Sequence, residues 1–100
     1  MICFIGDGEF LRIDHARHSG RRLDQIAAYY PRPLRLFGEV PGEFRAEHCL
    51  HKRFAAHRAL GGWFLYAPLR DWVSTVLAQG RLPDLNIEHA PKWRPRDGLP

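Results

Sequence analysis

The sequence predicts a small α/β (α+β) fold, in which a three-stranded, mostly antiparallel sheet is flanked by about three helices. Short apolar or alternating segments, which are typical of strands, take turns along the chain with longer segments whose apolar residues recur at the spacing of a helix. With 100 residues, of which 45% are hydrophobic, the chain can form one core. We expect one domain over residues 1–80 and a proline-rich arm over residues 81–100.

The N-terminal part predicts a β-hairpin followed by a helix. Residues 1–6 are apolar, the Gly-Asp-Gly at residues 6–8 suits a tight turn, and residues 9–14 alternate loosely, as a returning strand does. Ser19 can cap the helix that follows, because its hydroxyl can accept a hydrogen bond from a free backbone N–H. The apolar face of that helix contains Leu23, Ile26, Ala27 and Tyr30.

The middle of the chain predicts a third strand and a second helix. Pro31 and Pro33 end the first helix, because proline lacks the backbone N–H that a helix interior needs. Residues 34–40 then predict a strand. Residues 43–58 predict the second helix, which the Gly-Gly at residues 61–62 ends.

The last third of the chain predicts a further helix and an arm. Residues 63–66 are too few for a helix, and we expect an extended segment packed on the sheet. Pro68 suits the first turn of a third helix, which Gly80 ends. The apolar stripe of this helix contains Leu69, Trp72, Val73, Val76 and Leu77. The residues that follow show no apolar periodicity, so we expect an arm. This arm is either anchored by Trp93 or partly disordered.

The composition favours a basic protein of the cytoplasm. A formal net charge of +4 and a pI near 9.6 suit a polyanionic partner such as nucleic acid, although a merely basic soluble protein has the same charge. No run of about 18 apolar residues predicts a membrane span, and the N-terminus lacks the basic region of a signal peptide. Cys3 and Cys49 have no Cys-x-x-Cys spacing, which argues against a disulfide framework and a cysteine-based zinc site.

The segment over residues 47–54 (EHCLHKRF) is the most informative one for chemistry. Glu47, His51 and Arg58 fall on one helix face. A carboxylate beside cations suits a Mg²⁺ ion that also touches a phosphate, because Mg²⁺ takes one or two protein carboxylates and keeps several waters. The alternative is a solvated helix face with a Glu47–His51 pair. Zinc is disfavoured, because Cys49 projects to a different face from His51.

Basic residues and aromatic residues mark two further candidate sites. Arg21 and Arg22 open the first helix, where an arginine can clamp a phosphate; the alternative is an exposed charge, which the helix dipole would disfavour there. Tyr30 lies near Arg32 in the sequence, and Trp93 lies between two cations. An aromatic side chain can stack on a base while a neighbouring cation neutralises a phosphate. The alternative is that the tyrosine belongs to the core and the tryptophan anchors the tail.

Four segments follow one another in a recognisable order: residues 22–26 (RLDQI), 31–38 (PRPLRLFG), 47–54 (EHCLHKRF) and 62–64 (GWF). In this order and spacing they resemble the GIY-YIG nuclease superfamily, in the short branch found in phage and bacterial genomes. The resemblance covers residues 1–66.

This resemblance implies a DNA endonuclease domain that needs one Mg²⁺ ion. By position, Arg22 matches the arginine that stabilises the scissile phosphate, and Glu47 matches the metal ligand. His51 matches a histidine that the branch carries on this helix, and Arg12 falls where the branch often has a lysine. Further DNA contacts are expected from Arg21, His51 and Arg58.

Three positions depart from the pattern of the branch. Cys3 stands at or beside the tyrosine of the first motif, Asp14 stands at the glycine of the second motif, and Gly62 stands where the branch prefers glutamate. The side chain of Asp14 would crowd a substrate and add negative charge near its phosphate. His15 or Cys3 would have to replace the tyrosine as general base.

Three functions stay open from the sequence, and enzymatic activity is undecided among them. The first is an active Mg²⁺-dependent DNA endonuclease. The second is a degenerate nuclease domain that binds DNA or a protein partner without cutting, such as a phage-type regulator or inhibitor. The third is a purely structural α/β domain, which would apply if Arg22 and Glu47 lay far apart.

Overall fold

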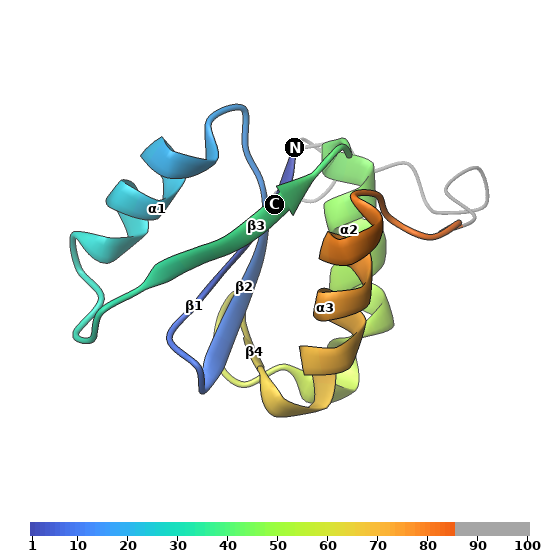
Figure 1. The fold of residues 1–100 in the computed structure, drawn as a ribbon. Coiled ribbons are helices and arrows are strands. Elements are labelled where there is room, and N and C mark those ends of the chain that lie inside the picture. Colours follow the sequence, from blue (N-terminus) through green and yellow to red (C-terminus); the bar gives the residue numbers. More distant parts are fainter. Residues whose placement is uncertain (86–100) are drawn as a thin grey trace, which may run out of the picture.

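A single antiparallel sheet forms the centre of the molecule, between one helix on one face and two helices on the other. The computed structural model describes residues 1–85, so the predicted role of Trp93 lies outside the described residues. In Figure 1, α1 (Ser19–Ala27) covers one face, and α2 (Phe44–Arg53) and α3 (Arg70–Gln79) lie on the other. The predicted α+β class is therefore confirmed. None of the described helices is long and apolar enough to cross a membrane.

The sheet contains four strands in the order β3-β1-β2-β4, and every neighbouring pair is antiparallel. Their bounds are Ile2–Gly6 for β1, Phe10–His15 for β2, Arg35–Val40 for β3 and Trp63–Leu65 for β4. The first two strands form the predicted hairpin. In its turn, the carboxylate of Asp7 accepts hydrogen bonds from the backbone N–H groups of Glu9 and Phe10, at 2.9 and 2.8 Å.

The prediction of a three-stranded sheet was one strand short. The segment at residues 63–66 was expected to pack on the sheet, but residues 63–65 join it as β4 and pair with β2 from Phe10 to Arg12. Because β4 has only three residues, it leaves the last part of β2 uncovered. Among the described residues, Ile13 to His15 have no strand neighbour on this side. This open stretch of sheet edge positions the candidate site.

The helices begin close to where they were expected, but two details differ. Ser19 is the first helical residue of α1 and not its cap, since the N-cap position belongs to His18. The second helix ends at Arg53 instead of near residue 58, because Phe54 turns into the core and a 3₁₀ turn follows over Ala55–His57. A second 3₁₀ turn, Ala67–Leu69, contains Pro68 and leads into α3.

Strict alternation along β1 and β2 divides the buried side chains between the two faces. Ile2 and Phe4 point to the core shared with α2 and α3, whereas Cys3 and Ile5 pack with Ile26 of α1. The α2 and α3 side holds most of the core, including Leu11, Ile13, Leu50, Phe64, Val73 and Val76. The α1 side is thinner, and two residues of β2 on that face, Arg12 and Asp14, are charged.

Two contacts hold the C-terminal part of the described chain against the sheet. Gly38 permits α3 to approach β3 closely, because a Cβ atom at this position would lie 2.6 Å from Cδ2 of Leu77. Leu82 and Leu85 pack against the same core as α3. The packing therefore continues beyond residue 80, where the domain was expected to end.

Candidate functional site

Asp14 gathers two arginines from different elements. Its Oδ2 atom accepts a hydrogen bond from Nε of Arg12 at 3.1 Å and another from Nε of Arg22 at 3.0 Å. The side chain of Asp14 is only 4% exposed, whereas those of Arg12 and Arg22 are 23% and 37% exposed. With two positive charges and one negative charge, the three side chains carry a net charge of +1. We call them the arginine cluster.

Local structure explains why these three side chains meet. Arg12 and Asp14 are two residues apart on β2, so both point to the face that α1 covers. Arg22 lies one turn into α1, which packs against this face through Leu23 and Ile26. A cation near a helix N-terminus is unfavourable by itself, and the ion pair with Asp14 offsets that cost.

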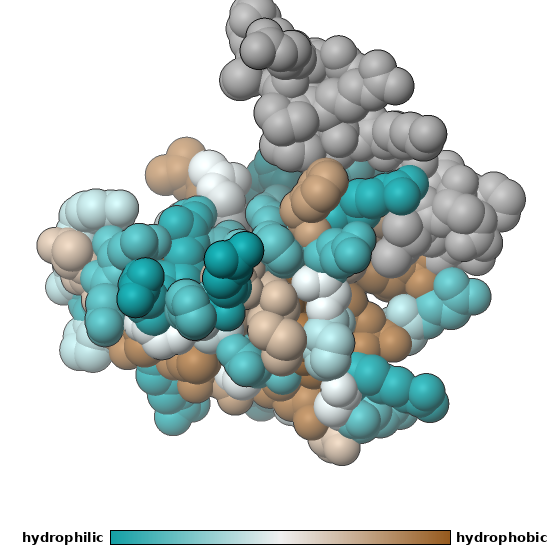
Figure 2. Space-filling view, turned by 90° about the horizontal axis from the view of Figure 1, so that it is seen from above, coloured by the Kyte–Doolittle hydropathy of each residue, from teal (hydrophilic) through white to brown (hydrophobic). Residues whose placement is uncertain are grey.

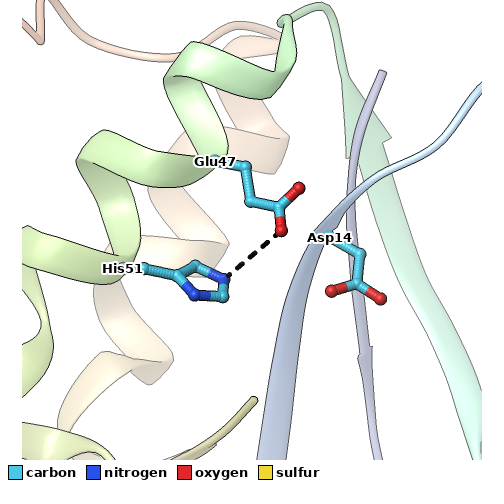
Figure 3. A group of neighbouring side chains, drawn as sticks. All are labelled: Asp14, Glu47 and His51. Atoms are coloured by element: carbon cyan, nitrogen blue, oxygen red, sulfur yellow. Dashed lines mark ion pairs between the residues drawn. The ribbon is translucent and has the colours of Figure 1, made fainter. Parts of the chain in front are cut away.

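On the other side of β2, two side chains of α2 bind the open edge of the strand. Oε2 of Glu47 accepts a hydrogen bond from the backbone N–H of His15 at 2.8 Å. Nε2 of His51 lies 2.7 Å from the carbonyl oxygen of Ile13, and since a carbonyl only accepts, this nitrogen carries the proton. Glu47 and His51 therefore replace the missing strand neighbour beyond β4. Figure 3 shows both side chains pointing from α2 toward β2, the strand that carries Asp14.

The same residues bring a possible ligand set together. Asp14, Glu47 and His51 each offer one ligand atom, and these atoms all lie within 4.8 Å of one another. Among the described residues, Oδ1 of Asp14 accepts no hydrogen bond, and Oε1 of Glu47 has only Nε2 of His51 nearby, at 3.9 Å.

One carboxylate oxygen from each of Asp14 and Glu47 fits a hard divalent ion such as Mg²⁺, which takes oxygen ligands and retains several waters. Asp14 and Glu47 would hold it. His51 does not fit as a ligand in this arrangement, because its Nε2 atom is a donor to the carbonyl of Ile13.

Two hollows with mostly basic linings adjoin these residues. One has a volume of about 550 Å³ and is lined by Phe44, Glu47, His48, His51, Lys52, Ala55 and Arg58. The other, of about 330 Å³, is lined by His15, Ala16, Arg17, His18, Arg21, Arg22 and Gln25. One residue of each hollow takes part in the hydrogen bond between His15 and Glu47. Figure 2 views this end of the molecule from above, and hydrophilic surface dominates on the side of α1.

The structure therefore places most of the predicted site residues together. Arg21 and His15 are exposed and line the hollow beside α1. Arg58 lies beyond the end of α2 but still lines the hollow beside Glu47, with its guanidinium 5.5 Å from the ring centre of Phe64. Two cationic hollows joined by two carboxylates can bind phosphate groups and a divalent cation at the same place.

Cys3 does not join this surface. Its side chain is fully buried under α1, and it pairs across the hairpin with Asp14. Burial raises the pKa of the Cys3 thiol, and the negative charge of Asp14 raises it further, against the opposing effects of Ser19 and Arg22. The thiol is therefore protonated at neutral pH and has no route to a water molecule. Among the residues suggested as general base, the exposed His15 has the better position.

Sequence reasoning treated Asp14 as an obstacle and missed its role as the common partner of Arg12 and Arg22. The i, i+2 spacing of Arg12 and Asp14 on a strand was a signal, because such residues share a face. The pairing with Arg22 had no local signal. Gly62 also adjoins this cluster, since a Cβ atom there would lie 3.3 Å from Nη1 of Arg12.

Comparison of the chain with models of protein families, with curated proteins and with solved structures finds no match. The relation to the GIY-YIG nucleases therefore stays a proposal, which depends on the four sequence segments and on the geometry of the arginine cluster and its neighbours.

Proposed function

We propose that this chain is a GIY-YIG-like DNA endonuclease domain that hydrolyses phosphodiester bonds with the help of one Mg²⁺ ion. The observation that carries the proposal is the convergence of Arg12, Arg22 and Glu47, which come from three elements, on Asp14 at the open edge of β2. A purely structural domain has no need for two basic hollows on either side of such a cluster.

Each side chain has a role in this proposal. Arg22 and Arg12 bind the oxygens of the scissile phosphate, exchanging part of their contact with Asp14 for it. Asp14 and Glu47 would hold the metal ion, which would supply positive charge against the charge that develops on the leaving oxygen. The exposed imidazole of His15 takes a proton from the attacking water, a role that histidine fills near neutral pH. Arg21 and Arg58 contact flanking phosphates.

A supercoiled plasmid offers a direct test, because one cut converts it to a slower-migrating form. With Mg²⁺, we expect nicking by the wild type, and loss of at least about 10²-fold in rate for Arg22→Ala and His15→Ala. Glu47→Gln tests the metal ligand specifically: it removes the carboxylate charge, but its amide oxygen still accepts the hydrogen bond from the backbone N–H of His15. Arg70→Ala removes an exposed arginine on α3 that lines neither of the two basic hollows, and is the matched control.

Equal nicking by the wild type and all the variants would identify a contaminating nuclease and contradict the proposal. Nicking that persists in EDTA would contradict the proposed need for a metal ion. The proposal would be supported if Arg70→Ala nicks DNA like the wild type and the other variants do not.

DNA binding without cleavage is a second candidate function, and two observations favour it. Asp14 already neutralises half of the charge of Arg12 and Arg22, and the buried Cys3 supplies no base. In this case the wild type would not nick DNA but would bind it, with an affinity that falls steeply as the salt concentration rises. Binding that does not depend on salt would contradict this candidate and leave a protein partner as the ligand.

A further inference from the structure

An apolar hollow of about 220 Å³ opens on the α1 side of the sheet, outside the site described above. It is lined by Phe10, Tyr30, Ala59, Leu60 and Trp63. Drug-sized ligands occupy pockets of roughly 300–1,000 Å³, so this hollow suits a single planar ring system. Leu60 lies at its rim and is 81% exposed.

The aromatic rings of this hollow are held in place by their neighbours. The ring centres of Tyr30 and Trp63 are 4.7 Å apart with an angle of 32° between the planes. The hydroxyl of Tyr30 donates a hydrogen bond to Oδ2 of Asp7 at 2.6 Å, which fixes the ring from its far end. A rigid aromatic lining costs little conformational entropy when a planar ligand stacks on it.

The hollow and the arginine cluster follow one another along the same strand face. Phe10, Arg12 and Asp14 alternate on β2, so they point to one side at steps of about 6.6 Å. Arg12 connects the two features, because its guanidinium lies 5.4 Å from the ring centre of Trp63 and also pairs with Asp14. A ring seated in the hollow would therefore lie directly beside the positive charge of the cluster.

Arg12 is the cation that adjoins the hollow. Arg58 does not line it, although it precedes Ala59 and Leu60 in the chain: its guanidinium lies over the ring of Phe64, which packs in the core on the other face of the sheet. The occupant should therefore combine an aromatic ring with negative charge on the side of Arg12.

We infer that the apolar hollow binds one unstacked nucleobase, while Arg12 contacts the phosphate next to it. Stacking of bases on aromatic side chains beside a cationic groove is the general way in which proteins bind single-stranded nucleic acid. The inference rests on the proposed function and narrows its substrate class to single-stranded DNA, or to duplex DNA with an unpaired base. Fully paired duplex cannot offer a free base to the hollow without paying for unstacking.

The test compares the binding of a labelled oligo(dT) with that of a blunt duplex of equal phosphate number, by fluorescence anisotropy in EDTA. We expect the wild-type chain to bind the oligo(dT) at least about fivefold more tightly, since one stacked base contributes that much or more. Leu60→Glu places a like charge beside the incoming phosphate, and Leu60→Ser only removes apolar contact. Both should reduce binding of oligo(dT) and leave duplex binding nearly unchanged.

Tyr29→Ser is the matched control, because Tyr29 is 82% exposed but does not line the hollow. A second readout does not depend on any change at Leu60. A Trp72→Phe/Trp93→Phe variant keeps Trp63 as its only tryptophan, and stacking of thymine on this ring should quench its emission as oligo(dT) is added.

The outcomes separate this inference from the proposed function. Equal affinity for both DNAs, no effect of Leu60→Glu and no quenching of Trp63 would overturn the inference, while a loss of binding in Arg22→Ala would still support a DNA site. Absence of binding to either DNA would overturn both. Preference for oligo(dT), lost in both Leu60 variants and kept in Tyr29→Ser, would support the inference.

Discussion

Asp14 has two opposing effects on a phosphodiester site. Its carboxylate orders Arg12 and Arg22 beside a possible metal ligand, but it also occupies the Nε donor of each arginine, which a phosphate could otherwise use. Charge-assisted hydrogen bonds are worth about 1.5–3 kcal/mol each, and less where the arginine is partly exposed, as it is in both pairs. A phosphate that binds this cluster therefore competes with the carboxylate of Asp14. Displacing that carboxylate costs a few kcal/mol at most, which a polyanion with several contacts can offset.

Removal of this competing charge should tighten DNA binding. In Asp14→Asn, the arginines keep one amide oxygen as an acceptor but lose the carboxylate, so we expect DNA affinity in EDTA to rise on the order of tenfold at low salt. The plot of log affinity against log salt should become steeper by about one phosphate contact. Asp71→Asn makes the same change in net charge on α3 and is the control. An equal gain from both variants would show that only net charge matters, and would contradict the specific role of Asp14.

At the scale of secondary structure, α2 completes the sheet at the edge that β4 leaves open. Its residues Glu47 and His51 are four positions apart and therefore lie one above the other on the helix. They satisfy an N–H and a carbonyl of β2 that lie on the same side of the strand. The pair that sequence reasoning assigned to metal and DNA binding thus also has a structural task. A variant of either residue can lose activity through a displaced β2.

The structural task can be measured separately. His51→Ala leaves the carbonyl of the buried residue Ile13 without its hydrogen bond, and we expect the free energy of unfolding in urea to fall by about 1–3 kcal/mol. His48→Ala removes an imidazole from the same helix that has no hydrogen bond among the described residues, and it should change the stability by less than about 0.5 kcal/mol. Equal stability of His51→Ala and the wild type would refute the edge-binding role.

At the scale of the whole molecule, a polar network joins the β1–β2 turn to the chain after α1. The carboxylate of Asp7 accepts hydrogen bonds in its own turn and from the hydroxyl of Tyr30, and it forms an ion pair with Arg32. Burial alone would raise the pKa of Asp7, but the hydrogen bonds from Phe10, Tyr30 and Glu9 and the charge of Arg32 outweigh it and lower that pKa. The network also sets one wall of the apolar hollow through Tyr30.

This network predicts how the thermal stability of the protein depends on pH. Because the folded-state pKa of Asp7 is lowered from an ordinary value of 3.8, its contribution is fully present above that value and is lost as the pH falls through the folded-state pKa. We expect the melting temperature of the wild type to fall below about pH 4, and Asp7→Asn to show a smaller fall over the same range from a lower starting stability. Thermal melts followed by circular dichroism between pH 7 and pH 2 would check this. Parallel curves for the two proteins would contradict it.

Local patterns in the sequence predicted the fold class and most of the elements of the described chain. Glycine and proline positions and apolar spacing located the hairpin, the third strand and the three helices, because these signals act over a few neighbouring residues. The face shared by Arg12 and Asp14 could also have been predicted from strand alternation. The spacing within residues 47–58 predicted one helix face for Glu47, His51 and Arg58, which was wrong for Arg58 because the helix ends at Arg53, although all three residues line one hollow.

Contacts between distant parts of the chain account for the rest. The sequence predicted an extended segment after the Gly-Gly turn, but its pairing with β2 as a fourth strand depends on where the edge of β2 lies. The meeting of Arg22 with Asp14, the binding of Glu47 to the N–H of His15, and the burial of Cys3 all depend on how α1 and α2 pack on opposite faces of the sheet. Such contacts join residues far apart in the chain, where local patterns carry no information. For this protein, they turn a set of separate basic and acidic residues into one candidate site.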